Sequence, residues 1–299
     1  MIIKKWIQAG AVVLGKEHKE RNKPCQDRIA YVKKGGVHAI SLADGAGSKP
    51  RSEAGAEEAV LAICELMATE FDSYYMRAES GLKTDAEYQK DMADLKKEIV
   101  SRVQTAIAKK VAKGESITEL PCTLLFVAVK GEKLFLGHIG DGVIGALMSE
   151  GAQGSLRVLS APENGGAPNI TFFITGADAE KHLRLITGEF KELKGIILMS
   201  DGPEEVLYSA QQGLHENAKK LFSNFKGVKS ADYCDALSKF LSKQISKFSY
   251  DDLSLNILYL TDVDTASASE EYTNYLFEDV NEMITLSSYS YFLDNASKS

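Results

Sequence analysis

Four aspartates of this chain stand at the end or the beginning of an apolar stretch of strand length, usually beside a glycine. They are Asp44 in SLADGAG, Asp141 in GHIGDGVIG, Asp201 in IILMSDGPEE and Asp251 in FSYDDLSLNILYL. Asp-Gly is a common turn dipeptide, so each aspartate taken singly is more typical of a turn than of a metal ligand. If the flanking strands belong to one system of sheets, however, the four carboxylates converge on one rim.

A rim of carboxylates has a distinct chemistry. Clustered carboxylates repel one another and raise one another's pKa, so they are tolerated only when they are protonated or when cations neutralise them. A site made only of oxygen ligands favours hard ions such as Mg²⁺ or Mn²⁺ over Zn²⁺. A glycine after the aspartate lets backbone carbonyls and water approach such an ion closely. The pattern therefore predicts a divalent metal site.

The elements that would position these acids can be read from the hydrophobic pattern. Short apolar runs bounded by turn residues predict strands at 37–43, 122–129, 133–139, 143–148, 170–175, 195–200 and 254–260. Apolar residues at spacings of three and four predict helices over 52–71 and 92–111. Links of two to six residues between consecutive strands favour antiparallel pairing. The order of elements predicts an α+β fold.

Composition and charge narrow the function classes. The 299 residues have the 44% hydrophobic and 26% charged content of ordinary globular proteins, and no apolar run approaches the roughly 20 residues of a membrane span. The whole net charge of −7 lies in residues 261–299, so the neutral body does not favour a nucleic-acid partner. The cysteines stand far apart with no C-x-x-C spacing, which predicts buried thiols in a cytoplasmic protein.

The last part of the chain differs from the rest. We expect residues 1–260 to form one domain and residues 261–299 to form an acidic tail. After a Ser-rich, acidic stretch the tail carries apolar residues at helical spacing: Leu276, Val280, Met283 and Ile284. The simpler interpretation is a linker followed by a short helix docked on the body. The alternative is a regulatory or partner-binding segment.

In chain order, the motifs resemble the metal-dependent serine/threonine protein phosphatases (PPM, or type 2C), specifically the compact bacterial kind. PCQDRIAY is similar to the first acidic motif of that family, LADGAGS to its Asp-Gly loop and PCTLLFVAV to the strand after its helix pair. GHIGDGVIGAL resembles its Gly-Asp hairpin, LMSDGPEE its second Asp-Gly loop and DDLSLNILYL its closing strand. No single motif is specific, but six or seven in this order over residues 10 to 260 are.

The resemblance implies an αββα sandwich, in which helices flank two antiparallel sheets and two Mn²⁺ or Mg²⁺ ions bind at one end of the sheets. Carried over by position, Asp44 would bridge the two ions and the carbonyl of Gly45 would bind one of them. Asp201 and Asp251 would ligate the other ion.

Further residues would surround these ligands. By the same resemblance, Asp27 with Gln26 beside it would orient metal-bound water, and Asp141 with Asp201 would offer a weaker position for a third ion. Asp252 would be the ligand in place of Asp251 if the motif register shifts by one residue.

The chain departs from the family where many members have a histidine directly after the Asp-Gly, thought to protonate the leaving alkoxide. Ala46 stands there. A general acid is typically worth about 10²–10⁴-fold in rate. His18, His38 and His138 stand near the motifs, but a lone histidine beside an apolar strand is more often a structural hydrogen-bonding group. None of the three is assigned the role.

A second departure concerns the phosphate-binding arginine, which the family often places five residues before the first motif aspartate. Asn22 stands there. Arg21 and Lys23 flank it and are candidates for substrate binding. Lys49 and Arg51, just past the first Asp-Gly loop, are further candidates, although exposed cations before a helix are usually only solvated.

The implied function is hydrolysis of phosphoserine or phosphothreonine in protein substrates of a signalling pathway, by direct attack of a water that bridges two ions. No Cys-x₅-Arg loop is present, which agrees with a route without a covalent cysteine intermediate. Ala46 and Asn22 motivate an alternative, a phosphatase-like binding or scaffold module with little or no turnover. The retained acids favour the enzyme. A metal-dependent nuclease ranks third because the body lacks net positive charge.

Overall fold

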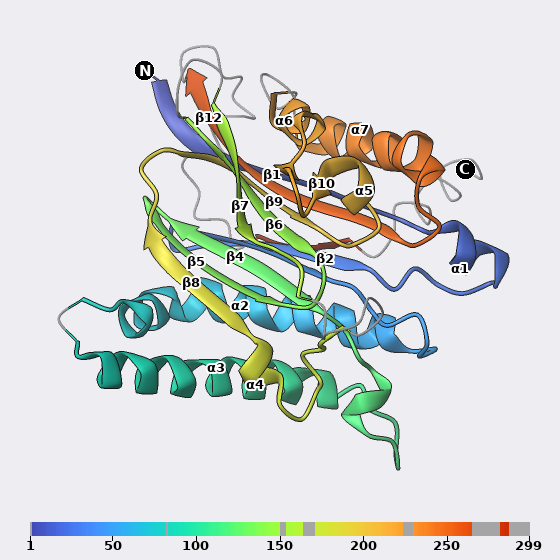
Figure 1. Ribbon diagram of the computed structural model, residues 1–299, viewed down its shortest axis with the longest axis horizontal. Coiled ribbons are helices and arrows are strands. Elements are labelled where there is room, and N and C mark those ends of the chain that lie inside the picture. Colours follow the sequence, from blue (N-terminus) through green and yellow to red (C-terminus); the bar gives the residue numbers. More distant parts are fainter. Residues whose placement is uncertain are drawn as a thin grey trace.

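Two antiparallel sheets stacked face to face form the centre of the molecule (Figure 1). The computed structural model describes residues 2–81, 83–149, 154–163, 171–223, 230–264 and 282–286. The first sheet has the order β1 (Ile2–Val13), β12 (Leu253–Asp264), β9 (Leu193–Met199), β6 (Val143–Met148) and β7 (Ser155–Ser160). The second has the order β13 (Glu282–Leu286), β2 (Arg28–Lys34), β3 (Val37–Ala43), β4 (Leu124–Lys130), β5 (Lys133–Ile139) and β8 (Arg184–Glu189).

Helices cover the outer faces of both sheets. The long pair α2 (Ser52–Ala78) and α3 (Asp85–Ala108) packs on the second sheet, and α6 (Glu216–Ser223) and α7 (Ser230–Lys243) pack on the first (Figure 1). Shorter elements make the connections: α1 (Lys16–Glu20), η1 (Ile117–Glu119), α4 (Ala179–His182), α5 (Glu204–Leu207), β10 (Tyr208–Ser209), β11 (Gly213–Leu214) and η2 (Ile245–Lys247). The predicted α+β class and αββα layering are confirmed.

Strand β3 shows how the sequence produces the layers. All seven of its residues are buried, because the strand is covered on both faces. Successive side chains point to opposite faces, so Ile40 and Leu42 join the core between the sheets. Ala39 and Ala43 instead face α2. A strand covered on both faces reads as one continuous apolar run, which is why 37–43 was recognisable.

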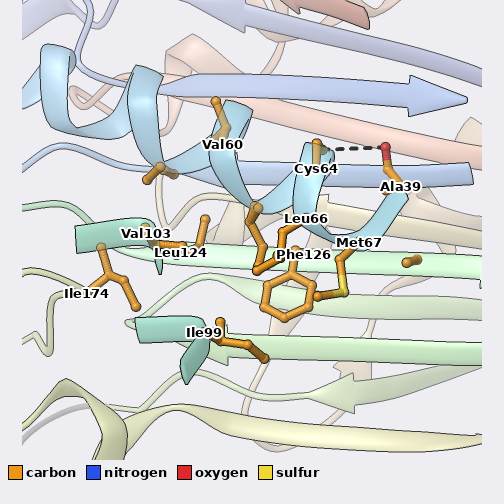
Figure 2. Packing of buried hydrophobic residues seen from close by; sticks show 14 of the residues in the cluster. Ala39, Val60, Cys64, Leu66, Met67, Ile99, Val103, Leu124, Phe126 and Ile174 are labelled. Carbon is orange, nitrogen blue, oxygen red and sulfur yellow. Dashed lines mark hydrogen bonds between the residues drawn. The ribbon is translucent and has the colours of Figure 1, made fainter. Parts of the chain in front are cut away.

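The helix-covered face of the second sheet is densely packed. Figure 2 shows Val60, Cys64 and Met67 of α2 lying over the sheet, with the aromatic ring of Phe126 below them. The thiol of Cys64 lies 3.5 Å from the carbonyl oxygen of Ala39 on the strand beneath. All four cysteines of the chain are buried and free, as the sequence predicted. This layer anchors β3, whose end carries the first Asp-Gly loop.

Three sequence predictions need correction. Residues 171–175 of the predicted strand 170–175 form irregular backbone that ends in a turn at 174–175. Ile174 is buried against the helix layer, and its N–H bonds to the carbonyl of Cys122 at 2.9 Å. Met283 and Ile284 lie in strand β13, paired with β2, rather than in a helix. Leu276 and Val280 lie outside the described residues. Strand β12 extends as far as Asp264, past the end of the predicted strand 254–260.

None of the helices in the described ranges is both long enough and apolar enough to cross a membrane.

Candidate active site

The predicted acids meet at one end of both sheets. Asp44 directly follows β3, and Asp201 is the second residue after β9. Asp141 lies between β5 and β6, and Asp251 and Asp27 stand just before β12 and β2. The antiparallel register brings these ends together, since Ala43 pairs with Arg28 and Met199 pairs with both Val143 and Leu255. The predicted convergence of carboxylates on one rim is therefore present.

Asp44 is held by its backbone, which leaves its carboxylate free. Its N–H donates to Thr123 Oγ1 at 2.9 Å, and its carbonyl accepts from the Thr123 N–H at 2.8 Å. The next residue, Gly45, donates its N–H to the carbonyl of Gln26 at 3.2 Å. No described residue donates a hydrogen bond to the Asp44 carboxylate. The loop is thus tied to β4 and to the start of β2, while its acid faces the other acids.

The electrostatics of the rim show crowding. Burial is the main cause that raises the pKa of the Asp44 carboxyl well above its ordinary value, and four neighbouring acids add to it: Asp27, Asp201, Asp251 and Asp141. Burial, then the charges of Asp251 and Asp141, raises the pKa of Asp201 to about 7. Like charges in a poorly solvated place disfavour ionisation of each carboxyl group. The rim is therefore an unfavourable place for negative charge unless cations are present.

Asp27 connects the two sheets beneath this rim. Its Oδ2 accepts a hydrogen bond from Ser200 Oγ at 2.9 Å, and Ser200 Oγ in turn accepts from the Ser254 N–H at 3.1 Å. Burial, followed by the charge of Asp252, raises the pKa of Asp27 well above its ordinary value. Ser200 and Ser254 thus fix a carboxyl that is 1% exposed.

The donor set fits divalent cations. Asp27 Oδ1 and Asp201 Oδ1 are buried and have no hydrogen-bond partner in the part of the chain that the structure describes. Buried polar atoms are normally paired, so such oxygens indicate a missing partner. Among the same residues, no three acidic, histidine or cysteine side chains lie close enough to hold an ion by themselves. An ion here would need backbone carbonyls and water as further ligands, which is ordinary for Mg²⁺.

Asp251 and Asp252 have different environments. Asp252 is 3% exposed, and its two oxygens accept from the Gly15 N–H at 2.7 Å and the Gln26 N–H at 2.6 Å. His18 Nδ1 lies 2.9 Å from Asp252 Oδ2. Asp251 as a whole residue is exposed, but its carboxyl is partly buried among neighbouring groups. This partial burial, followed by the charge of Asp252, raises the pKa of the carboxyl. Asp251 is thus the freer carboxylate of the two.

Asp141 has two neighbours that were not predicted as site residues, Thr171 and Glu204. Thr171 Oγ1 donates a hydrogen bond to Asp141 Oδ2. Burial, then the charge of Asp141, raises the pKa of Glu204 at the start of α5. Sequence reasoning missed Glu204, although it stands only three residues after Asp201 in the quoted motif. Thr171 carried no signal, because it lies in a segment predicted to be a strand.

Gly202 has a packing role that differs from the one expected. A Cβ at Gly202 would lie 2.1 Å from the carbonyl oxygen of Asp252, closer than any side-chain carbon can approach. Gly202 therefore lets the loop after β9 touch the loop before β12. This contact between the two loops fixes how Asp201 lies relative to Asp251.

The four basic residues that the sequence offers for substrate binding differ in their side-chain partners. Arg51 Nη1 lies 2.7 Å from Glu115 Oε2, and Lys49 Nζ lies 2.9 Å from Glu119 Oε2. Arg21 pairs with Glu17 at 2.7 Å. Lys23 alone of the four reaches the first Asp-Gly loop, where its Nζ donates to the carbonyl of Gly47 at 2.7 Å.

The backbone around Asn22 explains the direction of Lys23. Asn22 has a φ of 54°, in the left-handed region that asparagine tolerates better than most residues. The Lys23 N–H returns to the carbonyl of His18 at 2.8 Å and closes the end of α1. Asn22 therefore ends helix α1, at the position where the resembled family often has its phosphate-binding arginine.

A cavity of about 360 Å³ adjoins the first Asp-Gly loop. Its lining includes Ala46, Lys49, Phe172, Phe173 and His182. The His182 ring stacks on the Phe172 ring with a centroid distance of 3.4 Å. The wall is thus largely apolar and includes part of the loop that follows Asp44.

Two of the three histidines near the motifs, His38 and His138, are buried and hydrogen-bonded. His38 bonds to the Tyr31 hydroxyl at 2.9 Å, and burial lowers its pKa to about 4. His138 bonds to Ser160 Oγ at 2.9 Å, and burial, then the Arg184 charge, lowers its pKa well below the ordinary value.

Comparison with known proteins agrees with this geometry. The family model described as protein phosphatase 2C matches residues 14–244. The chain belongs to the protein phosphatase 2C family. The matched range includes Asp27, Asp44, Asp141 and Asp201. A comparison with curated protein sequences finds no match.

Solved structures of the family share the fold at low sequence identity. The serine/threonine phosphatase Stp1 from Staphylococcus aureus is 13% identical with a TM-score of 0.56, and the match covers 87% of this chain and 96% of that one. The serine/threonine phosphatase of S. agalactiae is 16% identical with a TM-score of 0.54, covering 85% and 99%. The serine-threonine phosphatase 2C of Toxoplasma gondii is 11% identical with a TM-score of 0.55, covering 87% and 99%.

Proposed function

We propose that this chain is a metal-dependent phosphatase that hydrolyses phosphoserine and phosphothreonine in proteins. The observation that carries the proposal is the convergence of Asp44, Asp201 and Asp251 at one end of both sheets, with raised pKa values, in a chain of the protein phosphatase 2C family. Clustered acids reduce stability unless cations neutralise them, so a module without metal chemistry has no physical need for them.

The ligands follow from which oxygens are free. Asp44, the carbonyl of Gly45, Asp201 and Asp251 would hold two Mn²⁺ or Mg²⁺ ions, and Asp141 would contribute to a third, weaker position. We prefer Asp251 to Asp252, whose oxygens are already engaged by two backbone N–H groups and His18. When bound, such ions lower the pKa of a water and polarise the phosphoryl oxygens.

The residues around the ligands would do the remaining work. Asp27, held by Ser200 and buried, would orient water beside the ions through its unpartnered Oδ1, with Gln26 Oε1, also buried and unpartnered among the described residues, as a second acceptor. Lys23, whose Nζ donates to the carbonyl of Gly47 in the first Asp-Gly loop, would attract the phosphate group. The cavity beside Ala46 would receive an apolar part of the protein substrate.

Turnover measurements test the proposal. p-Nitrophenyl phosphate and a phosphothreonine peptide are each incubated with the wild type and with Asp201→Asn, with and without millimolar Mn²⁺. We expect hydrolysis that needs Mn²⁺ and that falls more than about 100-fold in Asp201→Asn, because second-layer changes alone cost 10–100-fold at metal sites. Turnover that is independent of Mn²⁺, or unaffected by the substitution, would contradict the proposal.

Ala46 favours one alternative, a phosphatase-like binding or scaffold module with weak or no turnover. A histidine at that position is the usual proton donor of the resembled family, and a proton donor is worth about 10²–10⁴-fold. If neither substrate is hydrolysed while calorimetry shows Mn²⁺ binding, the binding module replaces the phosphatase.

A further inference from the structure

His18 has a position that the sequence did not reveal. It lies in the short helix α1 and is 6% exposed. Its Nδ1 lies 2.9 Å from Asp252 Oδ2, although the two residues are 234 positions apart in the chain. The ring therefore links the helix that precedes β2 with the loop that precedes β12.

The carboxylate that holds His18 is itself fixed. Asp252 accepts from the N–H groups of Gly15 and Gln26, at 2.7 and 2.6 Å. A carboxylate accepts hydrogen bonds, so Nδ1 of His18 carries a hydrogen and donates a hydrogen bond to Asp252 Oδ2. The ring orientation and the donor at Nδ1 are then set, which leaves Nε2 as the nitrogen that can exchange a proton.

The free nitrogen points toward the first Asp-Gly loop. A Cβ at Gly47 would lie 3.6 Å from His18 Nε2. Gly47 directly follows Ala46, the position at which the resembled family carries its histidine. No residue in the described ranges forms a hydrogen bond with His18 Nε2. Lys23 also reaches this loop, at the carbonyl of Gly47. The chain thus lacks a histidine at position 46, but the Nε2 of His18 lies beside the neighbouring residue, Gly47.

We propose that His18 Nε2 donates a proton to the leaving oxygen of the substrate and that Asp252 positions the ring. This role rests on the proposed phosphatase function. A water oxygen forms the new bond to phosphorus, and the ester P–O bond breaks with its electron pair remaining on the serine or threonine oxygen. The proton from Nε2 moves to that oxygen and releases the alcohol. His18 then regains a proton from solvent, and the proton lost by the attacking water also enters solvent.

His182 is the competing histidine, because it lines the cavity beside Ala46. Its ring is stacked on Phe172, its Nδ1 lies 3.5 Å from Glu163 and its Nε2 lies 3.8 Å from Asp178. Both of its nitrogens therefore face acids, whereas only one nitrogen of His18 does. His182 makes a matched control.

Leaving-group dependence tests the role. p-Nitrophenolate leaves as a stable anion and needs no proton, whereas a threonine alkoxide needs one. His18→Asn keeps an amide donor near Asp252 and removes Nε2. With Mn²⁺ present, we expect kcat for a phosphothreonine peptide to fall about 10²–10⁴-fold in His18→Asn, and kcat for p-nitrophenyl phosphate to fall less than tenfold. The retained p-nitrophenyl phosphate turnover shows that the variant is folded.

Each other outcome has a defined meaning. Equal losses on both substrates, no loss, or a selective loss in His182→Asn in place of His18→Asn would overturn the role of His18 and leave the phosphatase function standing. A wild type that hydrolyses neither substrate would overturn the phosphatase function and this role with it. If His18→Asn does not fold, His18→Gln is measured in the same way, with the same selective loss expected.

Discussion

The middle of the sandwich and its acidic rim both bury polar groups, but they do so in opposite ways. In the middle, Gln8 Nε2 donates to Asn256 Oδ1 at 2.8 Å, and Asn256 Nδ2 donates to the carbonyls of Ala30 and Ser41 at 2.9 and 3.0 Å. At the rim, Asp201 keeps a buried oxygen without a partner among the described residues.

The difference separates a structural polar network from a binding site. A buried network with all its partners fixes the register of the two sheets and supports stability. A group of unpartnered, like-charged acids weakens the fold and is retained where an ion completes it. Changes in the middle should therefore lower stability at every pH, whereas changes at the rim should act on metal binding, on turnover and on the pH dependence of stability.

The largest expected effect is on the pH dependence of the metal-free protein. Asp201 has a pKa of about 7 in the folded chain and ionises near pH 4 when unfolded. Between those values the unfolded chain has already released a proton that the folded chain retains. The free energy of unfolding should therefore fall as pH rises from about 4 to 7, by up to about 4 kcal/mol from this group.

Urea unfolding at a series of pH values, without divalent ions, checks this prediction. The wild type is compared with Asp201→Asn, so that titrating groups away from the rim cancel. The difference between the two proteins should grow with pH across the window, and millimolar Mn²⁺ should stabilise the wild type most at the alkaline end. A pH-independent difference would contradict the assigned crowding of the rim.

A smaller effect is expected in the middle of the sandwich. Asn256→Ala leaves Gln8 Nε2 and two backbone carbonyls without their partner, which should lower the free energy of unfolding by about 3 kcal/mol at every pH. Chemical denaturation measures the change. Thr105→Ala, which removes an exposed bond to Ser101, should change stability by no more than about 0.5 kcal/mol. Similar losses in both variants would contradict a structural role for the buried network around Asn256.

The smallest effect concerns the substrate side of the rim. Lys23→Met should raise KM for a phosphothreonine peptide about tenfold, or about 1.4 kcal/mol, with little change in kcat. Arg51→Met is the control, because Arg51 is occupied by Glu115 and by the carbonyl of Lys110. Steady-state kinetics would contradict the assignment if Arg51→Met raised KM as much as Lys23→Met.

Sequence patterns predicted the elements that are covered on both faces and the acids that follow them. Strand β3 and Asp44 are the clearest case, since an apolar run ends at Asp-Gly. Strand β1 was missed because its lysines break the apolar pattern. The segment 170–175 was wrongly predicted as a strand, because the apolar Ile174 is buried against the helix layer without strand pairing.

Contacts between distant residues left no trace in the sequence. The bond from His18 to Asp252 spans 234 positions, and neither residue stands in a spacing that indicates the other. In the sequence Ser200 is likewise an ordinary residue at the end of a strand, and only the fold shows that it bonds to Asp27. The second layer of the site is therefore known only from the fold.

Calorimetric titration with Mn²⁺ tests most directly whether the rim is a metal site. The wild type, Asp44→Asn and Asp72→Asn are titrated under the same conditions, Asp72 being an exposed acid paired with Lys130 away from the rim. We predict that the wild type and Asp72→Asn bind Mn²⁺ alike and that Asp44→Asn loses at least tenfold in affinity. Equal binding by all three proteins, or no binding by the wild type, would contradict the account.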